Sequence, residues 1–320
     1  MKKCDLSILL ALLSIITRIV VFPGSTSAQP YTRLNLDAKR IQWSYLEYEV
    51  KSTSVDVTTE VRLEFSTKSE AEAAMIESDQ GDPLPVPASG CYKVTVNTII
   101  DSLLQSPVKS VDHLWFDPRD ATALGRDSFR QGEDDFKKEY RFTRQGVFRF
   151  QQEPKDKKEA SKGSDQWTKV IDRFYSYDAD RMGCPNITDR LLITYIASAS
   201  EMLDNNQPLS LCVFGKRQLF QVKLQPAGSQ SLKINYIEKN EQGEERRQGE
   251  VKAIQINLEA KPLESDLEQV EHFSFMGFLD KISFFIDPVR NLPVELKGEI
   301  PPVGVVTIKL KEAHLRNGTG

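Results

Sequence analysis

The sequence predicts a mainly β protein: a large antiparallel meander that forms an open or closed barrel-like sheet, accompanied by one amphipathic helix. Two observations lead to this prediction. Most apolar segments alternate apolar with polar residues, which is the pattern of strands with one buried and one solvated face. One segment, from about 188 to 204, instead has apolar residues at helical spacing.

The clearest alternating segment runs from Val55 to Phe65, where apolar side chains fall on one face and mostly charged or hydroxyl side chains on the other. A period of two sustained over this length fits a half-buried strand and fits no helix. Similar patterns predict strands at 43–50, 92–100, 113–116, 140–142, 147–150, 167–175, 219–225, 232–238 and 251–260.

Three further strands are predicted at 282–286, 294–300 and 306–311, separated by the proline-containing breaks DPVRN and PPVG. Proline fixes φ and favours a turn at both breaks. Gly298 falls on the apolar side of its strand, which indicates a bend or the close approach of another residue. These strands therefore continue an antiparallel meander with one wet face and one dry face.

The predicted helix has signals at both ends. Asn186 or Thr188 is available as the N-cap, Asp189 lies in the first turn, and the stretch DNNQP stops the helix. Such a helix either covers an open end or the concave face of the sheet, or packs on the sheet to complete the core. Two polar segments, 67–90 and 151–165, are expected to be long loops within the same domain.

The first residues have the layout of a secretory signal peptide: a basic start, a short apolar run from Leu6 to Ile16, and small residues before a cleavage point after Ala28. The apolar run is shorter than the roughly 20 residues that span a bilayer. An uncleaved anchor is the alternative, although Arg18 interrupts its extension. We therefore expect a signal peptide at 1–28, one β-rich domain at 29–315, a disordered tail at 316–320, and no stable membrane span after cleavage.

Export allows cysteines to pair. Cleavage after Ala28 leaves Cys91, Cys184 and Cys212, and the last two flank the predicted helix. A disulfide between Cys184 and Cys212 would join the helix to the following strand, and the alternative is three buried free thiols. Because there is no CxxC spacing and the histidines are scattered, we expect no metal site and no cofactor.

Composition and motifs limit the classes of function. The net charge of −4 is spread along the chain, so no nucleic-acid partner is expected. The sequence has no GxSxG, no HExxH and no glycine-rich phosphate loop. A glycan-directed hydrolase with two acidic residues stays a weaker alternative, against the reading of these residues as turn formers and solvated side chains; the candidates are Asp117, Asp172, Asp178, Asp180 and Asp189.

Aromatic residues are frequent in the predicted strands. An apolar inner face that carries aromatic rings suits a lipid or another apolar ligand, and equally suits an ordinary β core. The candidate ligand contacts on this face are Trp43, Trp115, Tyr195 and Phe284.

Three segments carry a resemblance to a known family: YDADRMGCPNITDRLLITYI, LSLCVFGKRQLFQVKL and ISFFIDPVRNLPVELKGEIPPVGVVTIKL. They resemble a family of exported bacterial proteins catalogued as domain of unknown function 3108, and 43–65 resembles its opening hairpin more faintly. The resemblance implies a location in the Gram-negative periplasm and a mainly antiparallel, barrel-like β fold. It implies no catalytic residues. The cysteine pair and the two long loops depart from the family pattern.

These observations lead us to expect an exported, periplasmic, non-enzymatic protein that binds or carries an apolar or amphiphilic molecule of the cell envelope. The alternative is a structural or assembly factor that contacts envelope proteins or glycans.

Overall fold

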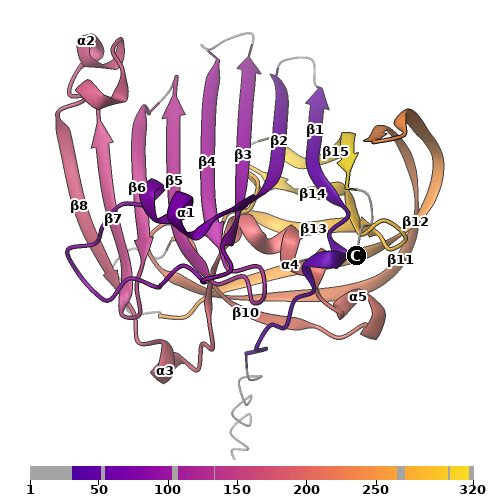
Figure 1. The fold of residues 1–320 in the computed structure, drawn as a ribbon. Coiled ribbons are helices and arrows are strands. Elements are labelled where there is room, and N and C mark those ends of the chain that lie inside the picture. Colours follow the sequence, from indigo (N-terminus) through magenta and orange to yellow (C-terminus); the bar gives the residue numbers. More distant parts are fainter. Residues whose placement is uncertain are drawn as a thin grey trace, which may run out of the picture. The chain divides into compact units, whose positions relative to one another are not determined.

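The computed structural model describes residues 31–51, 55–102, 107–132, 134–264, 271–301 and 303–316. The chain divides into two units, Met1–Pro30 and Tyr31–Gly320, and only the second contains described residues. All strands named below belong to one sheet, in the order β8-β7-β6-β5-β4-β3-β2-β1-β15-β14-β13-β12-β11-β10-β9 (Figure 1). The predicted mainly β fold with a large antiparallel sheet is thereby confirmed.

The first half of the sheet is an antiparallel meander that we call the wing. Each of its strands pairs with the next one along the chain. The strands of the wing are β1 (Trp43–Lys51), β2 (Val55–Ser66), β3 (Cys91–Ser102), β4 (Val108–Phe116), β5 (Ala123–Gln131), β6 (Phe136–Phe142), β7 (Gly146–Glu153) and β8 (Lys169–Ser176).

The second half contains β9 (Ile187–Asp189), β10 (Leu209–Phe214), β11 (Leu219–Asn240), β12 (Gly243–Pro262), β13 (Asp280–Asp287), β14 (Leu292–Ile300) and β15 (Gly304–Leu315). Strand β15 pairs with β1 and so joins this half to the wing. The end of β11 also pairs with β15, in parallel, over Ile237–Lys239 and Glu312–His314. Strands β11 to β15 therefore form a closed ring of five, while the wing continues outward from β15.

The helices are short: η1 (Ala38–Arg40), α1 (Lys68–Ala74), α2 (Lys157–Ala160), η2 (Ser164–Gln166), α3 (Ala179–Met182), η3 (Arg190–Leu192), α4 (Ile193–Ala199) and α5 (Met202–Asn205). Within the described residues, none of the helices combines the length and the apolar content that crossing a membrane requires.

The segment 188–204 is not one continuous helix. It begins in strand β9, because Ile187–Asp189 pairs with β10, and it continues as η3, α4 and α5. The residue that caps the first turn is Asp189, which accepts a hydrogen bond from the Leu191 N–H, rather than Asn186 or Thr188. Ser200 has an extended backbone and separates α4 from α5. Nearly every residue of α4 is buried, so this helix fills the interior of the unit.

The segments expected to be long loops contain helices. In 67–90, Thr67 and Glu70 form a capping box at the start of α1. In 151–165, strand β7 extends to Glu153, and Asp156 then caps α2. The spacing T-x-x-E at Thr67 is the sequence signal that indicates the first of these helices.

The predicted disordered tail, 316–320, includes one residue that makes specific contacts, Arg316. Arg316 donates hydrogen bonds from its backbone to the Gln42 carbonyl and from its guanidinium to the Leu63 carbonyl. Its side chain also lies over the Tyr92 ring. The remaining tail, 317–320, and the expected signal peptide at 1–28 lie outside the described residues.

The wing is covered on both faces. Its inner face, which carries Leu114 and Val147, packs on the large core together with α4 and β10. Its opposite face carries a smaller cluster made of Ala71, Met75, Val86, Cys91, Trp115 and Leu124. In the ring, an added Cβ at Gly298 would lie 2.5 Å from the Phe278 ring, which confirms the predicted close approach at this glycine.

Candidate functional site

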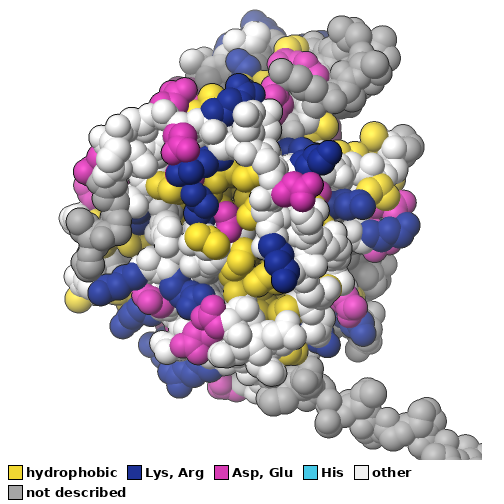
Figure 2. All heavy atoms as spheres, turned by 90° about the vertical axis from the view of Figure 1, so that its right-hand side faces the viewer, with side chains coloured by type: hydrophobic (Ala, Val, Ile, Leu, Met, Phe, Trp, Pro, Cys, Tyr) yellow, Lys and Arg dark blue, Asp and Glu magenta, His cyan; other side chains and the backbone are white. Residues whose placement is uncertain are grey.

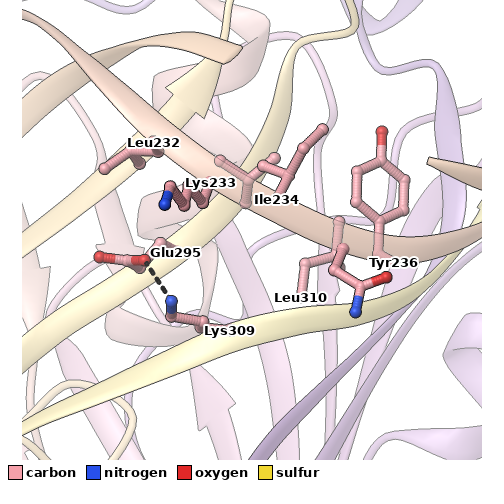
Figure 3. Close-up of a pocket in the computed structure, with 9 residues that line it drawn as sticks. Leu232, Lys233, Ile234, Tyr236, Glu295, Lys309 and Leu310 are labelled. Carbon is pink, nitrogen blue, oxygen red and sulfur yellow. Dashed lines mark ion pairs between the residues drawn. The ribbon is translucent and has the colours of Figure 1, made fainter. Parts of the chain in front are cut away.

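A cavity of about 370 Å³ lies between β11, β14 and β15 (Figure 3). Its size is at the lower end of the range of small-molecule sites, roughly 300–1,000 Å³. The residues that line it are Leu232, Lys233, Ile234, Asn235, Tyr236, Val294, Glu295, Lys309 and Leu310.

The cavity forms because β15 changes its neighbour. Strand β14 pairs with β15 as far as Glu295 and Lys309, and β11 pairs with β15 only from Glu312 onward. Between these two ladders the edges of β11 and β14 diverge. Side chains from both faces of the strands therefore reach the cavity, since the opening lies between strand edges rather than over one face.

The inner part of the cavity is apolar. Val294, Leu310 and Tyr236 are buried, and Leu232 and Ile234 are half-buried against the same core. Covering these side chains with a hydrocarbon group would contribute about 25 cal/mol for each Å² of apolar surface removed from solvent, although the cavity surface as a whole is mixed, with polar groups contributing at least as much as apolar ones.

Charged groups lie at the edge of the cavity. The Lys309 Nζ is 3.7 Å from a Glu295 carboxylate oxygen, and Lys233 projects beside this pair (Figure 3). The Lys309 side chain is largely exposed and Glu295 is mostly buried. Two ammonium groups and one carboxylate give this edge a net positive charge, which suits an anionic head group.

A buried carboxylate and its two partly exposed arginine partners lie at the end of the cavity. The Tyr236 hydroxyl lies 3.4 Å from Glu238, whose side chain is 3 % exposed. Glu238 accepts hydrogen bonds from Arg247 at 2.9 Å and from Arg290 at 2.8 Å. Burial raises the pKa of the Tyr236 hydroxyl, and Glu238 adds to this shift, so this hydroxyl is neutral and suited to hydrogen bonding. The network holds β11 in place where it closes the ring.

The face shown in Figure 2 is the side of Figure 1 on which β11 and β12 lie. Hydrophobic side chains reach the surface there in a band, and side chains of both charge signs lie beside it (Figure 2). An exposed apolar band of this kind can mark a ligand-binding groove.

The four aromatic residues predicted from the sequence lie elsewhere. Trp43, Tyr195 and Phe284 are in the large core, and Trp115 is in the smaller cluster on the opposite face of the wing. All four are buried, and none of them lines the cavity described above. Tyr195 donates a hydrogen bond to the Pro118 carbonyl and its ring contacts Phe116, which is ordinary core packing.

Three of the five candidate acidic residues have structural partners, and the other two, Asp172 and Asp180, are exposed. Asp117 pairs with Arg119 at 2.6 Å, Asp178 caps α3, and Asp189 pairs with Arg126 at 2.6 Å. In the described part of the chain, no three His, Cys, Asp or Glu side chains are grouped as metal ligands.

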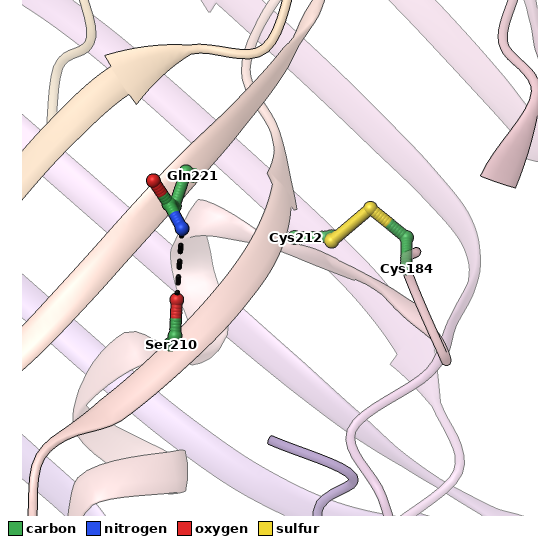
Figure 4. Close-up of a disulfide and its surroundings, with 4 residues drawn as sticks. All are labelled: Cys184, Ser210, Cys212 and Gln221. Atoms are coloured by element: carbon green, nitrogen blue, oxygen red, sulfur yellow. Dashed lines mark hydrogen bonds between the residues drawn. A yellow bond between two sulfur atoms is a disulfide. The ribbon is translucent and has the colours of Figure 1, made fainter. Parts of the chain in front are cut away.

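Cys184 and Cys212 form a disulfide (Figure 4). Cys212 lies in β10 opposite Ile187 of β9, so the bond fastens the segment before β9 to the strand with which β9 pairs. Both cysteines are buried, and the remaining described cysteine, Cys91, is a buried free thiol.

The cavity was not predicted from the sequence because its lining combines β11 with the hairpin of β14 and β15, which lies more than fifty residues further along the chain. Residues 232–238 are recognisable as a strand from their alternation, but the pattern does not say which strand lies beside them. The signal that could have found the site is the pair of lysines, Lys233 and Lys309, each flanked by apolar residues of a strand.

Comparisons with known proteins add little. No family model and no curated protein matches the sequence. Among solved structures, the chain is similar to a β-barrel-like protein of domain of unknown function DUF1849 from Brucella abortus. The similarity covers 87 % of this chain and 99 % of that chain, with 9 % sequence identity and a TM-score of 0.41. At these values the neighbour supports no statement about the ligand or function of this chain.

Proposed function

We propose that this is an exported, non-enzymatic protein that binds an amphiphilic molecule, with the apolar part of the ligand in the cavity between β11, β14 and β15. The observation that carries the proposal is the composition of the lining: Leu232, Ile234, Val294 and Leu310 surround the interior, and lysines lie at the edge. An amphiphile with an anionic head satisfies both parts, because its chain leaves water and its head meets the ammonium groups.

Export is part of the proposal and has two supports. The first residues have the layout of a signal peptide. The disulfide between Cys184 and Cys212 is a bond that persists in oxidising compartments such as the bacterial periplasm. The resemblance to the exported family catalogued as domain of unknown function 3108 agrees with this location, and membership of that family is likewise a proposal.

The test uses purified mature protein and a fluorescent fatty-acid probe. Ile234→Trp adds volume in the lining and should abolish uptake of the probe, whereas Val305→Trp changes an exposed valine outside the lining and should leave uptake intact. Native mass spectrometry of the wild-type protein should detect a bound amphiphile that is lost in Ile234→Trp. Uptake that is equal in the two tryptophan variants would exclude this cavity as the binding site.

The head group is tested by charge reversal. Lys233→Glu and Lys309→Glu should weaken binding of an anionic probe by about tenfold each, and binding of a zwitterionic probe by less. Lys252→Glu, on the exposed face of β12, is the matched control because it makes the same charge change away from the cavity.

An edge of β11 favours a second candidate, an assembly factor. From Gln225 to Tyr236, β11 pairs with β12 on one side, and no strand in the described ranges pairs with its other side. A free strand edge can take up an extended segment of another protein. A photo-crosslinking residue at Gln230 should then give one discrete protein adduct in cells, while the same residue at Lys109 on the wing should give none.

A further inference from the structure

Two cations on the inner face of the wing form no ion pair with an acidic side chain among the described residues. Arg149 of β7 is only 8 % exposed, and its buried Nε makes no hydrogen bond. Its guanidinium group lies over the Tyr175 ring, and the guanidinium carbon is 5.2 Å from the ring centroid. Lys138 of β6 is half-buried, and its Nζ lies 3.5 Å from the centroid of the Phe136 ring. Buried charges are normally paired, so both positions require an explanation.

The strand register brings these cations together. Arg126, Tyr140 and Arg149 are cross-strand neighbours on β5, β6 and β7 and share the inner face. Lys138 is two residues from Tyr140 on the same face, diagonal to Arg149. The neighbour of Arg149 on β8 is Arg173, so two like charges lie directly opposite each other. Such a pair is unfavourable unless a counter-charge lies nearby.

The nearby carboxylates are already engaged. Asp189 forms an ion pair with Arg126, with both side chains almost fully buried. Glu153 pairs with Lys169 and accepts from Gln151. Glu271 accepts from the backbone N–H groups of Lys216 and Arg217, which lie in the turn between β10 and β11. None of these acids forms an ion pair with Arg149 or Lys138, although Glu153 is near enough to Lys138 to raise its pKa.

The turn between β10 and β11 adds two exposed cations. Lys216 is close enough to Lys138 to lower its pKa, and Arg217 is close enough to Tyr175 to act on its hydroxyl. Burial, Arg149 and Lys216 together lower the pKa of Lys138 to about 8. The surroundings of Lys138 thus disfavour positive charge when nothing negative is bound.

We propose that Arg149 and Lys138 bind the phosphate group of a ligand, with Lys216 and Arg217 at the entrance. A phosphate dianion fits better than a carboxylate, because it neutralises one buried and one half-buried cation with one group and offers the several acceptor oxygens that an arginine fork and an ammonium require. The phosphate comes either from a soluble ion or ester, or from the head group of a lipid. The proposal is independent of the cavity between β11, β14 and β15, which lies on other strands.

The arrangement has a stability signature. Replacing a cation that contributes to packing or to an ion pair lowers the stability of the protein. Replacing an unpaired buried cation whose role is to bind a ligand does not. We therefore expect Arg149→Gln to have a melting temperature equal to or above that of the wild type in phosphate-free buffer. Adding phosphate should raise the melting temperature of the wild type and leave that of Arg149→Gln unchanged.

Binding is measured by isothermal titration calorimetry on the mature full-length protein, with inorganic phosphate, pyrophosphate and acetate at constant ionic strength. Arg149→Gln and Lys138→Gln should each bind phosphate at least about tenfold more weakly, as expected for loss of a charge-assisted hydrogen bond. Lys109→Gln is the control, because it removes an exposed lysine from the opposite face of the wing. Acetate should bind more weakly than phosphate to every protein.

A short-chain phosphatidic acid, used below its critical micelle concentration, distinguishes a lipid head group from a soluble phosphate ligand. Tighter binding of this lipid than of inorganic phosphate supports a lipid head group, and equal binding supports a soluble ligand. In both cases Arg149→Gln must reduce the affinity.

A further experiment measures the affinity for sulfate as a function of pH, which reports the charge of Lys138. Sulfate is used because its own charge does not change between pH 7 and 10. Affinity should fall as the pH rises through about 8, because Lys138 loses its proton there, and Lys138→Gln should remove this dependence. The groups acting on Lys138 are Arg149, Arg126 and Lys216, which lower its pKa, and Glu153, which raises it.

Three results would overturn the proposal. One is that neither phosphate nor pyrophosphate binds, or that both bind the wild type and the two glutamine variants equally. Another is that Arg149→Gln loses stability to the same extent with and without phosphate while Lys138→Gln binds normally. The third is that acetate binds as tightly as phosphate.

Discussion

Removing the disulfide between Cys184 and Cys212 should cost this protein a large part of its stability. The bond closes a segment with a sequence separation of 28 residues, which contains β9, η3, α4 and α5. Without it, the unfolded chain gains conformational freedom, while the native packing of α4 stays possible. The change we consider is Cys184→Ala with Cys212→Ala, because alanine introduces no buried hydroxyl group.

The size of the effect follows from the length of the closed segment. In the chain-entropy treatment, a separation of 28 residues corresponds to about 3.5 kcal/mol at 25 °C. For a chain of this size, 1 kcal/mol shifts the melting temperature by roughly 1.6 °C, so the expected decrease is about 6 °C. The lost sulfur atoms add a smaller packing cost, since both cysteines are buried.

The packing cost is measured separately with Cys91→Ala. Cys91 is buried and free, so this variant loses one sulfur atom and no cross-link. The difference between the double variant and twice the effect of Cys91→Ala estimates the contribution of the cross-link. Urea unfolding followed by circular dichroism gives the free energies of unfolding. Wild-type protein that is reduced while unfolded and then refolded in dithiothreitol loses the cross-link but keeps both sulfur atoms, so it should be more stable than the double variant by the packing cost alone.

The double variant itself should not respond to dithiothreitol. The reasoning is refuted if the double variant loses no more stability than two copies of the Cys91→Ala effect. It is also refuted if alkylation of the unfolded, unreduced wild-type protein labels all of its cysteines, because the bond is then absent.

Three further predictions concern packing and charge. Gly298→Ala should lower the free energy of unfolding by about 1–3 kcal/mol, because the new Cβ collides with the buried Phe278 ring, and unchanged urea unfolding would contradict this. Glu238→Gln should cost about 2–4 kcal/mol because it removes the buried carboxylate that Arg247 and Arg290 share, although Arg290 keeps its contact with Asp287. The control Glu245→Gln, at an exposed carboxylate that also pairs with Arg247, should cost less than about 0.5 kcal/mol. Burial and Glu139 raise the pKa of Asp127 to about 7, well above its value in an unfolded chain, so the folded protein loses stability as the pH rises from 4 through 7. Asp127→Asn should therefore be more stable than the wild type at pH 8, by about 1–2 kcal/mol after allowance for solvent screening, and the two should converge at pH 4; equal differences at both pH values would contradict this.

The existence of most strands was predictable because each has a dry face that its own residues encode. Their ends were less predictable. The stretch Pro226–Gly228 indicates a turn between two strands, yet β11 runs through it with a bulge between Pro226 and Ser229. Proline and glycine serve turns and bulges alike, so the local pattern cannot distinguish two short strands from one long bent strand.

The cavity was not predictable for a different reason. It exists because the end of β11 pairs with β15 at Glu312–His314, and these segments are separated by more than seventy residues. Alternation specifies which face of a strand is buried but not which strand lies beside it. The same limit applies to the aromatic residues predicted as ligand contacts. Alternation places a residue such as Phe284 on the buried face of its strand, whether its ring lines a cavity or fills a core.

A local signal for the phosphate site does exist in the sequence. In the strand segment from Val147 to Phe150, alternation places Arg149 on the same face as Val147, which is fully buried. A charged residue at an inward position of a strand needs either a partner or a ligand. Arg126 has the same kind of position and finds Asp189, whereas Arg149 finds no acid in the described part of the chain. Both arginines point inward, and they differ in whether a carboxylate forms an ion pair with them. The ion pair marks Arg126 as structural, its absence makes Arg149 a candidate binding residue, and Arg149→Gln and Lys138→Gln test this distinction.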